Sequence, residues 1–132
     1  MTTVWVDTNV LLRFITGDPS ETARRARRLL RRAADGELTL RVPSVVIAEI
    51  IWLLGSYYSS DRATIAEAIR GLVLADGVLA ENKDLVLDAL RLMQDANVAY
   101  VDAYIAASAR ANGEAVAAFD NDFKRLGVEL FS

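Results

Sequence analysis

The chain of 132 residues contains no histidine and no cysteine. Without them it has no usual general base at neutral pH, no Ser-His or Cys-His nucleophile pair, and neither a disulfide nor a thiolate metal site. A bound metal ion would therefore be held by oxygen atoms, which selects Mg²⁺, Mn²⁺ or Ca²⁺. If the chain is an enzyme, carboxylates are the groups expected to do its chemistry.

Long apolar runs and strong net charge are also missing. No stretch approaches the roughly 20 apolar residues of a membrane span, and the first residues do not read as a secretory signal. We therefore expect no membrane association and a reducing, cytoplasmic location. The net charge of −3 argues against a protein that coats nucleic acid by bulk charge. It leaves room for a local basic patch.

The length and the 53% of hydrophobic residues fit a single domain over residues 1–132. Apolar runs typical of strands occur at 3–6, 38–42, 77–79, 115–119 and 128–131. Helical patterns begin near residues 7, 18, 44, 61, 82 and 100, between these runs. The alternation predicts an α/β fold with a central, largely parallel sheet of about five strands flanked by helices.

Two aspartates stand directly after predicted strands. Asp7 follows the first apolar run, and Asp120 follows the run at 115–119. In open parallel sheets, ligands bind beyond the carboxyl ends of the strands. We therefore expect both carboxylates at that edge of the sheet.

Two further acids interrupt apolar helices. Glu49 is the only charged residue between Arg41 and Asp61, and Asp102 is the only one between Asp95 and Arg110. A helix that is apolar on all sides is normally buried, and a buried carboxylate without a partner costs several kcal/mol. Each of these acids is therefore expected to have a cation or an arginine beside it.

Taken one at a time, each of the four acids has an ordinary explanation as a helix cap, a turn residue or a buried salt bridge. Taken together they favour a cluster, because two end strands and two interrupt apolar helices. Clustered carboxylates repel one another unless cations neutralise them or their pKa values rise. Cations held by carboxylates suit phosphodiester hydrolysis, which then needs no histidine.

The motifs around these acids resemble those of PIN domains, notably the VapC-type toxins of toxin–antitoxin pairs. The similarity covers essentially the whole chain, and the motifs follow one another in the family's order. They are Val4–Arg13 around Asp7, Pro43–Glu49, Tyr100–Ala107 around Asp102, and Phe119–Phe123 around Asp120.

The resemblance implies an endoribonuclease dependent on Mg²⁺ or Mn²⁺. Its metal site carries over to Asp7, Glu49, Asp102 and Asp120, with Asp122 more peripheral and with Thr8 and Asn9 in support. The chain departs from the family at Ala118, where a threonine or serine is usual, so a hydroxyl that assists the site is missing. The resemblance also implies a homodimer that is silenced by a small cognate antitoxin. The antitoxin would bind in an exposed apolar groove, and the residues that could form one lie near a helix end: Trp52, Leu53, Tyr57 and Tyr58. The alternative is that these side chains pack in the core in the ordinary way.

Basic side chains are candidates for contact with RNA. Arg13 lies one helical turn from Asn9 and could bind a phosphate or pair with an acid. The second helix carries six arginines, of which Arg24 and Arg28 are candidates for phosphate binding and would make binding dependent on salt. A solvated helix face is the alternative. The six are Arg24, Arg25, Arg27, Arg28, Arg31 and Arg32.

Other functions fit less well. A haloacid-dehalogenase-like phosphatase needs a second acid two residues after the first, where this chain has Asn9. A phospho-accepting receiver domain needs a lysine late in the fold, after a strand, and neither Lys83 nor Lys124 stands there. Two alternatives stay open: a catalytically weak PIN-like interaction module, and a metal nuclease that acts on DNA. The sequence does not identify the target RNA.

Overall fold

The computed structural model describes residues 2–131. Its sheet has three parallel strands in the order β1-β2-β3, with bounds Thr2–Trp5, Leu38–Val42 and Val78–Ala80. Thr3 pairs with Thr39 on one side of β2, and Leu79 pairs with Arg41 on the other. The α/β class and the parallel sheet are confirmed, whereas the expected five strands are wrong, since three are found in the described residues.

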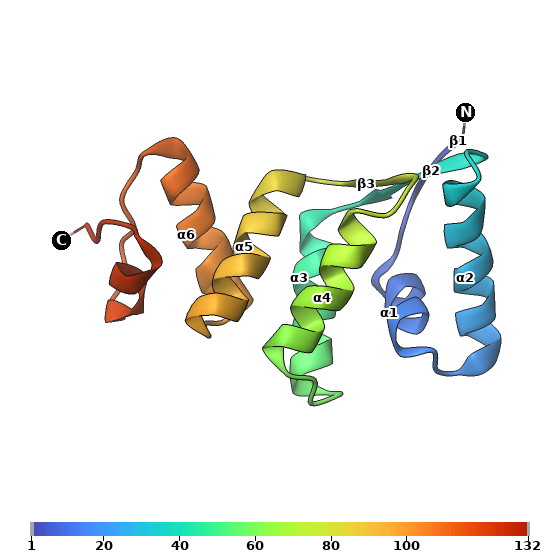
Figure 1. Ribbon diagram of the computed structural model, residues 1–132, viewed down its shortest axis with the longest axis horizontal. Coiled ribbons are helices and arrows are strands. Elements are labelled where there is room, and N and C mark those ends of the chain that lie inside the picture. Colours follow the sequence, from blue (N-terminus) through green and yellow to red (C-terminus); the bar gives the residue numbers. More distant parts are fainter. Residues whose placement is uncertain (1, 132) are drawn as a thin grey trace.

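Six α-helices and one short 3-10 helix accompany the sheet in residues 2–131. In Figure 1 α1 and α2 lie at one end of the molecule, α3 and α4 in the middle, and α5 and α6 with the C-terminal segment at the other end. The bounds are α1 Thr8–Thr16, α2 Ser20–Ala34, α3 Ser44–Ser56, α4 Arg62–Val73, α5 Lys83–Ala96, α6 Tyr100–Asn112 and η1 Asn121–Leu126.

Apolar periodicity explains these elements. In β2 the alternate residues Leu38, Leu40 and Val42 are buried, while Arg41 is exposed. In α2 the buried residues are spaced by three and four, as one face of a helix requires: Ala23, Ala26, Leu30 and Ala33. The core formed in this way is one cluster that extends from Val6 to Val128. Among the helices of residues 2–131, none is long and apolar enough to cross a bilayer.

The C-terminal segments differ from the prediction. Residues 115–119 and 128–131 form a single bridge, Val116 to Leu130, in place of two strands of the sheet. Val116 donates a backbone hydrogen bond to Glu129 at 2.8 Å and accepts one from Phe131 at 2.8 Å. These two segments therefore bond to each other, at the end of the molecule far from β1 (Figure 1).

Candidate functional site

Asp7 stands at the turn from β1 to α1. The N–H of Val6 donates to the carbonyl of Arg41 at 3.0 Å, which extends the pairing of β1 up to this turn. Asp7 occupies the N-cap position of α1, yet its side chain makes no capping hydrogen bond. Asp61 provides the contrast: at the N-cap of α4 it accepts a bond from the N–H of Thr64 at 2.8 Å, and this bond lowers its pKa. The ordinary explanation of Asp7 as a cap is therefore not realised.

The neighbours of Asp7 point to opposite sides of the first turn. Thr8 is buried with 8% of its surface exposed, and Asn9 is exposed. Asn9 lines a groove between α1 and α2. Thr8 thus anchors the turn in the core, while Asp7 and Asn9 remain accessible to a ligand.

Glu49 is exposed, so the prediction that it is buried is wrong. The reason is that α3 is apolar on both its inner and its outer side, but only the inner side is covered by the core. Its inner side is buried in the core and consists of Ile47, Ile50, Ile51 and Leu54. Its outer side faces solvent, where Val45 is 75% exposed and Trp52 65%. Glu49 shares this outer side and needs no counter-charge there.

Asp102 is half-buried in the first turn of α6. No described residue forms a hydrogen bond or an ion pair with its side chain, which leaves the expected arginine partner unrealised. The position itself supplies part of the missing stabilisation, because the N-terminal turn of a helix favours negative charge. Its carboxylate is available to a ligand.

Asp120 and Asp122 have structural roles in η1. Asp120 is the N-cap, and its Oδ1 accepts a hydrogen bond from the N–H of Asp122 at 2.9 Å. The carboxylate of Asp122 lies 3.5 Å from Nε of Arg125. The explanation of Asp120 as a capping turn residue is therefore realised, and a ligand would have to share its carboxylate with the cap.

These acids are spread over four helices that pack one against the next. Asp7 is the N-cap of α1, which packs on α3 with Glu49; α3 packs on α6 with Asp102, and α6 packs on η1, whose N-cap is Asp120. Within residues 2–131 no three acidic side chains are placed to hold one metal ion. The oxygen donors suit Mg²⁺ or Mn²⁺ in kind, but their arrangement in this structure does not fit a metal site.

The basic candidates also separate. Arg13 is half-buried and donates to the carbonyl of Asp18 at 3.2 Å and to the hydroxyl of Tyr58 at 3.5 Å, rather than to an acid. Arg24 and Arg28 are exposed, and neither lines the groove that contains Asn9. Arg25 does line it, together with Arg13. Arg25 was not one of the two arginines of α2 predicted to bind phosphate, although its helical position, on the same side as Leu29, indicates that it faces this groove.

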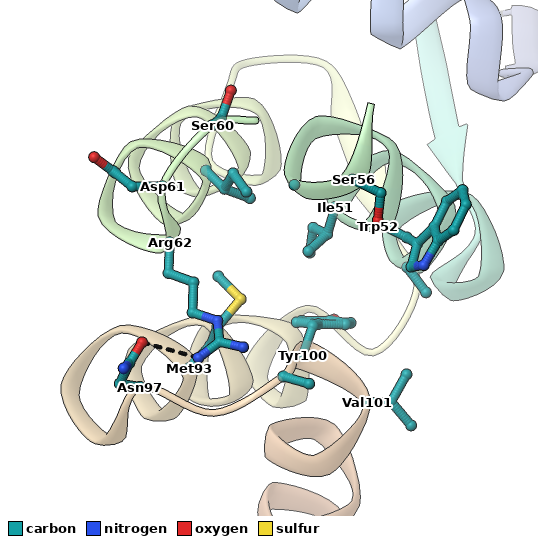
Figure 2. A pocket seen from close by; sticks show the side chains of 14 residues that line it. Ile51, Trp52, Ser56, Ser60, Asp61, Arg62, Met93, Asn97, Tyr100 and Val101 are labelled. Atoms are coloured by element: carbon teal, nitrogen blue, oxygen red, sulfur yellow. Dashed lines mark hydrogen bonds between the residues drawn. The ribbon is translucent and has the colours of Figure 1, made fainter. Parts of the chain in front are cut away.

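A hollow of about 510 Å³ lies between α3, α4 and the junction of α5 with α6. Figure 2 shows Ile51, Trp52, Met93 and Tyr100 around it, with Arg62 donating to Asn97 at 2.8 Å on one side. Of the four residues predicted to form a groove, only Trp52 lines this hollow. Leu53 is half-buried, and Tyr57 and Tyr58 are exposed with their rings in edge contact.

Tyr100 gives this hollow a polar feature that the sequence did not reveal. Its side chain is 7% exposed, and its hydroxyl has no hydrogen-bond partner among the described residues. Burial raises the pKa of this hydroxyl well above the ordinary value. An unpaired buried hydroxyl is uncommon in folded proteins, and because the oxygen of Tyr100 is itself covered, its desolvation is not compensated by any described residue.

Comparison with known proteins agrees with the motifs. Residues 4–129 match the family model described as PIN domain, and this range includes all four acids. The chain is also similar to a protein named VapC ribonuclease from Aquifex aeolicus (strain VF5), with 27% identity over 125 residues. That alignment covers 94% of this chain and 92% of the relative. The resemblance predicted from the four motifs is confirmed.

Proposed function

This chain belongs to the PIN-domain family, and we propose that it is a metal-dependent endoribonuclease, the toxin of a cytoplasmic toxin–antitoxin pair. One observation carries the proposal. No described residue bonds to the carboxylates of Asp7, Glu49 and Asp102, the acids that the motif resemblance assigns to the site. A protein that used these acids to hold its fold together would pair them, as it pairs Asp61 and Asp120.

Mg²⁺ or Mn²⁺ is the proposed cofactor, because carboxylate oxygen is the only strong ligand type the sequence offers in the motifs. Asp7, Glu49, Asp102 and Asp120 are the proposed ligands, with Asp122 beside them and Thr8 and Asn9 in support. Since no three acids of the described residues are placed to hold one ion, the proposal requires that α6 and η1 move closer to Asp7 when metal and substrate bind. The absence of a hydroxyl at Ala118 predicts a weak rather than an absent activity.

Two protein partners complete the proposal. The antitoxin is expected in the hollow of Figure 2, where Trp52 provides exposed apolar surface. A second copy of the chain is expected on the outer side of α3 and α6. There Val101 is 60% and Ile105 41% exposed, beside an apolar cavity of about 210 Å³.

The test is cleavage of RNA by the purified protein. We expect cleavage with Mg²⁺ or Mn²⁺, none with EDTA, and none by Asp7→Asn or Asp102→Asn. A matched DNA of the same sequence distinguishes the DNA-directed alternative, which would cleave both or DNA alone. If both variants cleave RNA like the parent protein, the assignment of the site is wrong. If calorimetry detects no metal binding and no nucleic acid is cleaved, the interaction module replaces the nuclease.

A further inference from the structure

A groove of about 520 Å³ runs between α1 and α2. Its polar side chains are Asn9 and Arg13 from α1 and Thr22 and Arg25 from α2, over an apolar floor that includes Leu29. No acidic side chain lines it. The groove is therefore a positively charged and hydrogen-bonding channel in a chain whose net charge is −3.

The two arginines are differently prepared for a ligand. Arg25 is exposed and forms no hydrogen bond or ion pair with the described residues, and Glu21, one turn earlier, does not pair with it. Arg13 is held by the carbonyl of Asp18 and the hydroxyl of Tyr58 through one nitrogen, Nη1. A guanidinium has five N–H donors, so Arg13 keeps free donors while its orientation is already restricted. Such restriction lowers the entropy lost on binding.

The groove is lined by a residue of the first acidic motif. Asn9 lies two residues after Asp7, and Arg13 lies four residues after Asn9 on the same helix. At a rise of 1.5 Å per residue, Arg13 is about 6 Å further along the axis of α1. That distance corresponds to roughly one or two nucleotides of a strand. A strand whose scissile phosphate lay at Asp7 would therefore reach Arg13 and Arg25 with a neighbouring phosphate.

We infer that the groove between α1 and α2 is a phosphate-binding subsite for the RNA chain, with Arg13 and Arg25 as its binding residues. The inference rests on the proposed nuclease function and adds where the substrate lies. Planar guanidinium groups bind phosphate with two donors at once. RNA fits better than an acidic segment of a protein, because the groove is lined by Asn9, a residue of the motif that would act on the substrate. The subsite binds a phosphate that does not react, so it stabilises the bound substrate and the transition state equally. Its loss should therefore weaken substrate binding and leave the rate of the chemical step unchanged.

The experiment measures the binding of a short, fluorescently labelled single-stranded RNA by anisotropy, in the uncleaving background Asp7→Asn, over a range of salt concentrations. Arg13→Gln and Arg25→Gln are compared with Arg31→Gln. Arg31 is an exposed arginine of the same helix that lines the cleft toward α4 instead. All three substitutions remove the same charge, so bulk electrostatics is matched.

We expect each groove variant to bind RNA about fivefold more weakly. The slope of log K against log salt should fall by about 0.7 for each phosphate that the variant no longer binds, and Arg31→Gln should leave both quantities nearly unchanged. With Asp7 intact, Arg25→Gln should raise KM for cleavage and leave kcat within about twofold. Equal effects of Arg25→Gln and Arg31→Gln would overturn the inference.

A competition arm tests the protein alternative. In this arm poly-glutamate competes with RNA for the parent protein and for the double variant Arg13→Gln/Arg25→Gln. The inference is wrong if the double variant binds RNA as the parent does and only the parent loses RNA to poly-glutamate. The groove would then bind an acidic protein segment. Failure of the nuclease itself gives a different result: the parent protein with intact Asp7 then cleaves no RNA under any condition, whatever the groove variants bind.

Discussion

The Oδ1 atom of Asp120 accepts a hydrogen bond from the N–H of Asp122 at 2.9 Å, whereas Asp7, at the equivalent N-cap position of α1, makes no such bond. Asp120 is therefore tied to the local fold, and Asp7 is not. The motifs place both acids in the same site. Because only Asp120 bonds to the local fold, substitutions of the two acids should affect stability and cleavage differently.

Asp7→Asn should leave the free energy of unfolding within about 0.5 kcal/mol of the parent value, because the side chain makes no bond that the substitution would remove. It should lower RNA cleavage at least about 100-fold, which corresponds to about 2.7 kcal/mol. Urea unfolding and a cleavage assay on the same preparation check both. A loss of stability that accounts for the loss of activity would contradict the prediction.

Asp120 should respond differently to two substitutions. Asparagine caps a helix about as well as aspartate, so Asp120→Asn should keep the stability and lose the cleavage. Asp120→Ala should lose the cleavage and also about 0.5–1 kcal/mol of stability. If Asp120→Asn cleaved RNA at the parent rate, its carboxylate would serve η1 alone.

Tyr100→Phe should stabilise the free protein by about 1 kcal/mol, because it removes a buried hydroxyl that has no partner. Tyr104→Phe is the matched control: the hydroxyl of Tyr104 accepts a hydrogen bond from Asn82 at 3.1 Å, so its removal should not stabilise. Thermal unfolding of the two variants beside the parent decides this. A lower midpoint for Tyr100→Phe would mean that its hydroxyl is satisfied in solution.

The same hydroxyl predicts a dependence on pH. Its folded-state pKa is raised, so between the unfolded pKa of about 10 and the higher folded pKa the unfolded chain has lost a proton that the folded chain keeps. Stability contributed by neutral Tyr100 is therefore fully present below about pH 10 and lost as the pH rises further. Urea unfolding from pH 8 to 11 should show a smaller loss for Tyr100→Phe than for the parent.

Gly77 should tolerate no side chain. Its φ is +78°, and a Cβ there would lie 2.3 Å from the carbonyl oxygen of Ala33, a backbone atom of the α2 end. Gly77→Ala should cost at least about 2 kcal/mol through the left-handed backbone and the overlap. Gly71→Ala, in the last turn of α4 with open space around it, should instead gain about 0.5 kcal/mol. Denaturant unfolding of both variants and the parent, compared by midpoint at equal slope, measures these changes. An unchanged midpoint for Gly77→Ala would show that Gly77 and the carbonyl of Ala33 do not lie this close together.

Much of this arrangement was predictable from the sequence. The amphipathic spacing in α2 and the alternation in β2 located both elements, because each period matches one buried face. The place of Asp7 after β1 followed from the apolar run before it. Local patterns of this kind depend on neighbouring residues, which a single sequence contains.

The wrong predictions concern which residues pair with a segment or cover it. The apolar run at 115–119 indicated a strand but not its partner, and in the structure Val116 pairs with Leu130 rather than with the sheet. In α3 the apolar outer side indicated burial of Glu49, although nothing in the described part of this chain covers Val45 or Trp52. Pairing and covering depend on distant residues or on another molecule, and a local pattern does not encode them.

The spread of the acids over α1, α3, α6 and η1, with no three placed to hold one ion in the described residues, predicts a movement on binding. Because the chain has no cysteine, Ala34→Cys in α2 and Ala111→Cys in α6, both exposed, can carry spin labels without background. We expect the distance between the labels to shorten when Mg²⁺ and RNA are added to the Asp7→Asn variant, and to remain long in the Asp102→Asn variant. An unchanged distance with bound RNA would show that the acids do not act as one site.

The outer side of α3 and α6 predicts a dimer. Val45, Val101 and Ile105 expose apolar surface beside a cavity lined by uncharged residues, and such a patch is typical of an interface. A two-fold interface places the same patch of both copies face to face, so a cavity with an uncharged lining suits a second copy of this chain. Val101→Glu should therefore shift the protein from dimer to monomer in sedimentation equilibrium, with its stability as a monomer nearly unchanged because Val101 is exposed.

The matched control is Leu74→Glu, which adds the same charge at an apolar residue that is 54% exposed at the end of α4 and should leave the dimer intact. A monomeric parent protein, or equal dissociation by both variants, would contradict this prediction.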